Sequence, residues 1–262
     1  MIRVVLGLTL ALLPNGAAGA GSRDVPRMVD ADAQLAHALA CKGALRGLEG
    51  VERERSRAVA VEAYGAVAAY FPKRRALCAQ AAFRAGELLR AGGDPRRAAE
   101  AFLRAIDLGR GTLFRPRARI ELAHVHRRAG RRQAALAEYE RVLFDPDATP
   151  HLRDLATSWA AHVQSQLGRE SDARRLWERV ARAGEDPLDQ VRAFDRWALS
   201  LVAGGELEAA AGVLELCRTR LRDRALEQTA LGERLRDALE RMRSVGPLAR
   251  AIRSRRQLPM PK

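Results

Sequence analysis

The hydrophobic positions of this chain recur in steps of four and seven residues, inside segments that glycine or proline ends. The stretch from Val61 to Pro72, VEAYGAVAAYFP, is one such segment, with an aromatic residue among alanines and valines. Steps of four and seven place side chains on one face of an α-helix. Alanine and leucine carry most of the apolar content, whereas strands are usually richer in β-branched and aromatic residues. The pattern therefore predicts a chain made of helices.

The same pattern recurs along the chain, although almost every residue differs between the copies. One register holds Ala60, Ala98, Ala135, Ala173 and Ala210, at spacings of 37 or 38 residues. Four residues later come Tyr64, Phe102, Tyr139, Trp177 and Leu214, and seven residues later come Val67, Ala105, Val142, Val180 and Cys217. Five residues before the alanine, the last four copies carry Gly93, Gly130, Gly168 and Gly205. These columns define about five copies of one unit.

Each unit is predicted to be a hairpin of two helices. The glycine ends the first helix, where a left-handed backbone is costly for a residue with a side chain. Asp94 and Pro95 then form a cap and first-turn pair for the second helix. The alanine permits close approach, and the larger residues fill the gap between neighbouring units. Trp177 is therefore expected to be buried, and Arg174 exposed.

The two ends of the chain differ from the repeats. Past Arg224, one helical stripe holds Leu231, Leu235, Ala238, Leu239 and Met242, which predicts a capping helix over residues 225–243. Residues 244–262 read as a basic tail. At the start, Arg3, the apolar run Val4–Leu13 and a small-x-small pattern ending at Ala20 are typical of a secretory signal peptide over residues 1–20. Residues 21–34 would be a linker, and the remaining chain is expected to lack a transmembrane segment.

The charge of the chain is strongly positive. The formal net charge is +14, and only Lys42, Lys73 and Lys262 among the 46 basic residues are not arginine. Such a balance draws a protein toward acidic partners. A second interpretation is that the arginine bias mirrors a GC-rich genome, and the sequence leaves both open.

The sequence shows no pattern that predicts catalysis, a cofactor or a metal site. It contains no zinc-protease motif, phosphate-binding loop or nucleophile elbow, and no small-molecule substrate is evident. Three cysteines are too few for a disulfide framework. Cys41 and Cys78 could pair in an oxidising compartment, leaving Cys217 buried, or all three could be small apolar packing residues. We therefore expect a protein that is not an enzyme.

The repeat resembles the tetratricopeptide repeat. Its first helix carries Gly86, Ala123, Ala161 and Ala198 at the small position, and glycine, alanine, a large residue and a trailing proline follow. The usual period is about 34 residues, and the longer period here is similar to repeats of bacterial envelope proteins. The first copy departs from the pattern, with Arg55 in place of the turn glycine. The resemblance implies an all-α, right-handed superhelical solenoid of about five hairpins over residues 35–224, plus the capping helix.

The resemblance also implies a binding surface. In the family, the concave wall comes from the first helix of each hairpin. Carried onto this sequence, the wall is expected to hold the partner-binding residues Phe83, Glu87, Arg90, Arg117, Ile120, His124, Arg127, Arg128, His162 and Gln166.

Three functions are compatible with these features. The first is an exported, non-catalytic scaffold of the bacterial periplasm or envelope, which binds a protein or peptide with acidic segments. The second is a basic structural protein that binds anionic envelope polymer or lipid head groups. The third is a nucleic-acid binder, which the leader disfavours because it directs the chain away from the cytosol.

Overall fold

A computed structural model describes residues 25–244, and these residues form eleven α-helices without a strand. The predicted leader, the first linker residues and almost all of the predicted basic tail lie outside the described residues. The helices are α1 (Ala31–Gly43), α2 (Gly50–Tyr70), α3 (Arg75–Ala91), α4 (Pro95–Leu108), α5 (Phe114–Arg128), α6 (Arg132–Leu143), α7 (Pro150–Gln166), α8 (Glu170–Ala183), α9 (Pro187–Ala203), α10 (Leu207–Leu226) and α11 (Ala230–Ser244).

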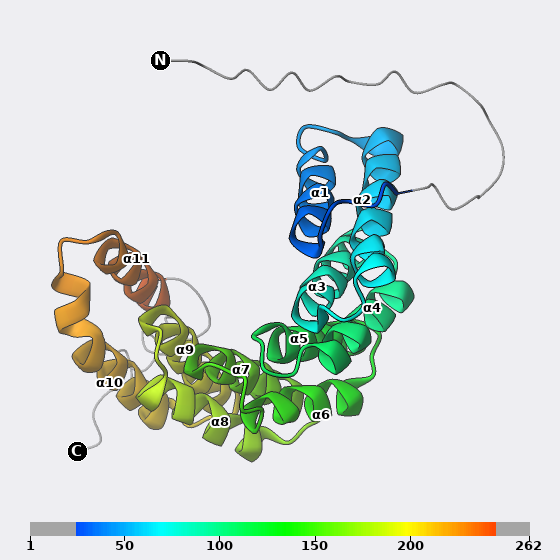
Figure 1. Ribbon diagram of the computed structural model, residues 1–262. Helices are drawn as coiled ribbons and strands as arrows, with labels where there is room; N and C mark the ends of the chain where they lie inside the picture. Colours follow the sequence, from blue (N-terminus) through cyan, green and yellow to red (C-terminus); the bar gives the residue numbers. More distant parts are fainter. Residues whose placement is uncertain (1–24, 245–262) are drawn as a thin grey trace, which may run out of the picture.

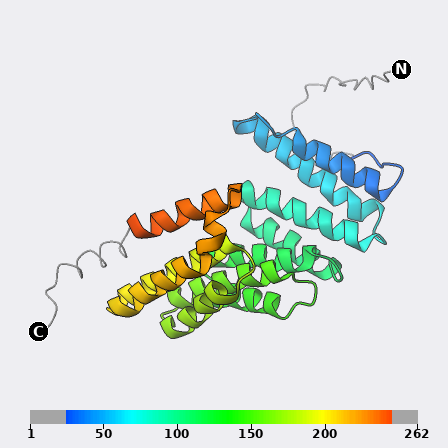
Figure 2. The same cartoon turned by 90° about the vertical axis from the view of Figure 1, so that its left-hand side faces the viewer.

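The helices are arranged as a curved stack of hairpins. Each helix packs against the next one in sequence, and the odd-numbered helices α1, α3, α5, α7 and α9 also contact one another in order. These odd-numbered helices line the concave side of the arc, and the even-numbered helices form its outer side (Figure 1). A view from the side shows the helix pairs stacked one on the next (Figure 2). The predicted all-α solenoid of hairpins is therefore confirmed.

The four turn glycines have the predicted backbone conformation. Gly93, Gly130, Gly168 and Gly205 have φ angles of 74° to 79°, in the left-handed region. After α3, the Gly93 amide donates to the carbonyl of Arg90 at 3.2 Å, and the Asp94 amide donates to that of Leu89 at 3.0 Å. This pair of bonds satisfies carbonyls that the helix end leaves free. Asp94 then accepts from the Arg97 amide at 3.0 Å and caps α4.

The repeated columns form the core of the stack. The five column alanines are fully buried, as are Tyr64, Phe102 and Tyr139. At Gly86, an added Cβ would lie 2.6 Å from the Phe102 ring, which explains the small residue at this place in the first helix. Leu214 is only partly buried, and its neighbour Val213 takes the buried place in the last hairpin.

Of two sequence expectations about the core, one differs from the structure. Trp177 is buried as expected, but Arg174 is not a free surface residue. Its guanidinium donates to the Ser200 hydroxyl at 2.7 Å and to the Ser200 carbonyl at 2.9 Å. Arg174 therefore ties α8 to α9, a long-range contact that local spacing does not reveal.

The first hairpin turns earlier than the repeat register implies. Arg55 lies inside α2, and the turn occupies residues 44–49. Gly47 and Gly50, with φ of 74° and 53°, supply the left-handed positions of this turn. Position 55 needs no glycine because α2 begins earlier than the repeat register implies, and it is longer than the second helices of the next three hairpins.

The last helix covers the end of the stack. α11 packs against both α9 and α10, and Leu235 is fully buried in the same cluster as Phe194 and Leu221. Ala238 and Leu239 contact this cluster, whereas Leu231 stays substantially exposed. Of the predicted stripe, the middle residues Leu235, Ala238 and Leu239 therefore make the contacts with the end of the stack.

The three cysteines are all free. Cys78 is buried, with its thiol 3.4 Å from the Phe71 carbonyl, and Cys41 is half-buried at the edge of the same apolar cluster. Burial raises the pKa of Cys217 to about 12. Of the two alternatives, the structure therefore shows packing residues and no pair between Cys41 and Cys78.

Candidate functional site

The candidate site is the concave wall formed by α3, α5 and α7, which we call the groove. These three helices lie side by side on the inner side of the arc (Figure 1). Positions i, i+4 and i+7 of a helix share one face, and on each helix these positions face the groove. They are Phe83, Glu87 and Arg90 on α3, Ile120, His124 and Arg127 on α5, and Leu155, Trp159 and His162 on α7.

One end of the groove is an apolar hollow of about 400 Å³. Phe83 and Ile120 are only 2% and 4% exposed, so they form its floor. Leu113 is 49% exposed and stands at its edge. The guanidinium of Arg117 lies over the Phe83 ring, 4.9 Å from its centroid. The remaining lining residues are Glu87, Glu121, Thr149, His151, Leu152 and Leu155.

The other end of the groove is cationic and aromatic. The guanidinium of Arg127 lies over the Trp159 ring at 4.7 Å. The His124 ring meets Trp159 edge-on at 4.8 Å, and the His162 ring does so at 5.8 Å. His124 Nδ1 shares a hydrogen bond of 2.6 Å with the Tyr139 hydroxyl. A guanidinium that lies over an aromatic face can still donate its N–H groups to acceptors in the guanidinium's own plane.

The two histidines at this end are uncharged at neutral pH. Burial, followed by the charges of Arg127, Arg90 and Arg128, lowers the pKa of His124 to about 4. Burial, followed by Arg127 and Arg196, also lowers the pKa of His162. The positive charge at this end of the groove is therefore carried by arginine.

Acidic groups neutralise some of these arginines. Arg90 pairs with Glu121 at 3.0 Å across α3 and α5, and Arg84 pairs with Glu87 at 2.8 Å. Burial is the main cause that raises the pKa of Glu121, and Arg90 opposes it. Among the ion pairs of residues 25–244, none uses Arg127, Arg128 or Arg196. Arg117, which lies over Phe83 at the hollow, is in none of these pairs either. Unpaired arginines therefore lie at both ends, one at the hollow and three around the aromatic end.

The structure divides the sequence-predicted residues between the two ends. Phe83, Glu87, Arg117 and Ile120 lie at the hollow, and His124, Arg127 and His162 at the aromatic end. Arg90 is engaged by Glu121, and Arg128 is exposed beside Arg127. Gln166 is exposed, with its Nε2 3.1 Å from His162 Nε2.

Sequence reasoning missed Trp159, Leu113 and Leu152. Trp159 lies four residues after Leu155 and three before His162, so it shares their helical face. That spacing was the available signal. Leu113 precedes α5 in a turn, where no helical period applies.

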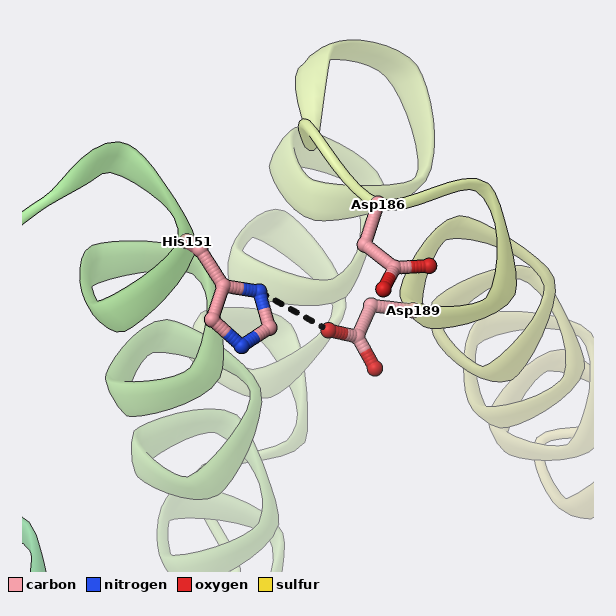
Figure 3. Close-up of side chains that lie close together, drawn as sticks. All are labelled: His151, Asp186 and Asp189. Atoms are coloured by element: carbon pink, nitrogen blue, oxygen red, sulfur yellow. Dashed lines mark ion pairs between the residues drawn. The ribbon is translucent and has the colours of Figure 1, made fainter. Parts of the chain in front are cut away.

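A cluster of possible metal ligands lies where α7 and α9 begin. His151, Asp186 and Asp189 place their ligand atoms within 4.8 Å of one another (Figure 3). Asp186 already accepts from the Leu188 amide at 2.7 Å and caps α9, and Asp189 pairs with Arg192 at 2.7 Å. His151 Nδ1 lies 3.7 Å from Asp189. Carboxylates are favoured at a helix N-terminus, where a cation is opposed, so capping and pairing account for the cluster.

A second hollow, of about 660 Å³, is lined by residues of α9 and of the capping helix α11. Its walls alternate in charge, with Arg192 and Asp195 on α9 and Arg234, Asp237 and Arg241 on α11. Burial raises the pKa of Asp195, against the effect of Arg196. With opposite charges interleaved, this hollow has no clear preference for one sign of ligand.

Comparison with known proteins supports the fold. The sequence matches no protein-family model and no curated protein. Among solved structures it is similar to MamA (16% identity, 76% of this chain and 98% of that chain, TM-score 0.54). It is also similar to a tetratricopeptide repeat protein from Parabacteroides merdae (15% identity, 88% of this chain and 81% of that chain, TM-score 0.55). A third similar structure is PilW, a type IV pilus biogenesis factor (16% identity, 86% of this chain and 89% of that chain, TM-score 0.51).

At such identity these similarities concern the fold, which is that of tetratricopeptide-repeat solenoids. The resemblance predicted from the repeat columns is confirmed at this level. Within residues 25–244, no helix is both long and apolar enough to cross a membrane.

Proposed function

We propose that this solenoid of the tetratricopeptide-repeat type is a non-catalytic scaffold of the bacterial cell envelope. It holds a protein or peptide partner with acidic segments in the groove. The observation that carries the proposal is Arg127, which is stacked on Trp159 and has no carboxylate within ion-pair distance in the described part of the chain. A partner carboxylate would complete this arrangement, because guanidinium and carboxylate form paired, charge-assisted hydrogen bonds.

Export to the envelope is the second part of the proposal. Its support is the leader-like pattern of Arg3, Val4–Leu13 and Ala20, together with the similarity in fold to PilW, a pilus biogenesis factor. Cleavage after Ala20 would remove Arg3 and lower the formal charge from +14 to 14 − 1 = +13. N-terminal sequencing of protein from the native host tests it, and a cytosolic chain that keeps Met1 would contradict it.

Capture of the native partner from an envelope extract tests the groove. Arg127→Glu combined with Arg128→Glu reverses two groove charges and should abolish capture, while the helical melting curve stays nearly unchanged. The matched control is Arg220→Glu with Arg222→Glu, which changes the net charge equally on exposed positions of α10, an outer helix. The control should capture the partner as the wild type does.

The same assay separates the groove from a general electrostatic anchor. A chain that lacks residues 245–262 loses basic residues of the predicted tail, including Arg250 and Arg253. Groove recognition predicts that this deletion has the smaller effect. If the deletion removes the partner and the groove reversal does not, the groove assignment is wrong, and binding to anionic polymer or lipid through basic surfaces takes its place.

A further inference from the structure

The groove changes character along the direction of its helices. Phe83, Ile120 and Leu155, on α3, α5 and α7, line the hollow. Seven residues later on each helix lie Arg90, Arg127 and His162. Trp159 on α7 contacts both His124 and Arg127 on α5. The segments of α5 and α7 that carry these residues therefore lie side by side. One end is thus apolar and the other cationic.

The apolar end suits an uncharged side chain. Its floor of Phe83 and Ile120 is almost fully shielded, and Leu113 leaves open apolar surface at the edge. Glu87 and Glu121 also line this hollow, but Arg84 and Arg90 already pair with them, and the unpaired Arg117 lines it as well. A leucine-sized side chain would remove apolar surface from water at this end.

The cationic end suits a carboxylate. Arg127 is held in place by Trp159, so little side-chain freedom remains to be lost on binding. Arg128 is exposed beside it, and Arg196 lies close enough to affect His162. Arg90, in contrast, is already paired with Glu121. Arg117 is unpaired too, but it lies over Phe83 at the hollow. At the cationic end the unpaired arginines are Arg127, Arg128 and Arg196.

The separation of the two ends limits the conformation of a ligand that reaches both. Ile120 and Arg127 are seven residues apart on one helix face, which at about 1.5 Å per residue is about 10 Å. A polyproline II segment has about three residues per turn and rises about 3.1 Å per residue, so side chains three positions apart point the same way at about 9 Å. In a β-strand, side chains three positions apart point to opposite faces.

We propose that the groove recognises an extended, polyproline II-like peptide segment that carries one large apolar side chain and one aspartate or glutamate three positions apart. The apolar side chain enters the hollow beside Leu113 and Ile120, and the carboxylate pairs with Arg127. This inference rests on the proposed function, because it specifies the ligand of the same groove.

Fluorescence anisotropy with short synthetic peptides tests the spacing. Each peptide carries one leucine and one glutamate in a proline- and alanine-rich background, separated by one to five positions and in both orders. Affinity should be highest at a separation of three, in one of the two orders. Replacing that leucine by serine should weaken binding by about 10- to 100-fold, because the buried apolar contact is lost and each factor of ten corresponds to about 1.4 kcal/mol.

Two protein variants, each with a matched control, test the assignment of the two ends. Leu113→Ser should remove the preference for leucine over serine, whereas Leu103→Ser, at a leucine of similar exposure on the outer helix α4, should not. Arg127→Gln should remove the preference for glutamate over glutamine, and Arg220→Gln should leave it intact. Circular dichroism melting of all four variants shows that each is folded.

The outcomes separate this inference from the proposed function. Peptides that bind through Arg127 with equal affinity at every separation would overturn the spacing and leave the scaffold in place. A preference for leucine that survives Leu113→Ser would overturn the use of the hollow. If no peptide binds, and reversal of Arg127 and Arg128 does not affect partner capture, the proposed function fails as well.

Discussion

At the scale of single residues, the groove depends on side chains that hold one another in place. Trp159 contacts Arg127 on one side and His124 and His162 at its edges. His124 is also fixed by its bond to Tyr139, a fully buried member of the repeated core. The surface of the groove is thereby connected to the packing of its own hairpin.

The environment of His124 leads to a prediction about pH. Its pKa is lowered from 6.5 to about 4, by burial first and then by neighbouring arginines. Between these values the unfolded chain binds a proton that the folded chain does not, so stability must fall as the pH decreases through this window. His124→Gln should lose less stability than the wild type between pH 7 and pH 5.

Thermal unfolding of both proteins at the two pH values measures this difference. An NMR titration of the His124 ring provides the direct check, because it follows the folded state alone. A His124 signal that titrates near the ordinary value of 6.5 would contradict the buried, arginine-flanked position of the ring.

At the scale of elements, the hairpin depends on contacts between a small residue and a large one. Gly86 on α3 faces Phe102 on α4 so closely that a Cβ would lie 2.6 Å from the ring. Gly212 on α10 lies in a helix too, but an added Cβ would meet nothing within 4 Å. The two glycines therefore have opposite roles, although both occupy helix interiors.

This contrast predicts opposite effects of one substitution. Gly86→Ala should lower the free energy of unfolding by about 1–3 kcal/mol, because extra volume in a packed core displaces its neighbours. Gly212→Ala should raise it by about 0.5–1 kcal/mol, because alanine is the better helix former. Chemical denaturation measures both. Stabilisation by both substitutions would show that α3 and α4 do not approach as closely as described.

The repeat was predictable from the sequence because its contacts are local and periodic. The turn glycines and the column alanines occupy equivalent places in each hairpin, so their spacing showed the fold. The handedness of the superhelix and the leader remain predictions. Arg174 was misjudged because its partner Ser200 lies on another helix, in a pairing that no repeated column predicts.

The site was predictable only in part, for the same reason. The position of each residue within the repeat predicted which side chains of each first helix face the groove, including His124 and Arg127. It did not predict which side chains of other helices those residues contact. The stacking of Arg127 on Trp159 and the pairing of Arg90 with Glu121 join neighbouring hairpins. Spacing within one helix cannot show which arginines are neutralised across the groove.

At the scale of the whole molecule, the excess of positive charge raises the question of which arginines interact with a partner. The formal charge is +14, and a general attraction would depend on all of it. Raising the salt concentration from about 0.1 M to 1 M shortens the screening length from about 10 Å to 3 Å, so both a general and a local attraction weaken. Salt sensitivity alone therefore does not identify the site.

Comparing salt sensitivity between variants of equal net charge does identify it. Arg127→Gln and Arg220→Gln each remove one positive charge, the first inside the groove and the second on an outer helix. If the groove binds an acidic segment, Arg127→Gln should weaken partner binding at low salt and flatten its dependence on salt, because a close charge pair has been lost. Arg220→Gln should leave both nearly unchanged, since a distant exposed charge is largely screened. Binding isotherms at several salt concentrations measure the slopes, and equal slopes in the two variants would mean that the partner responds to the total charge and not to the groove.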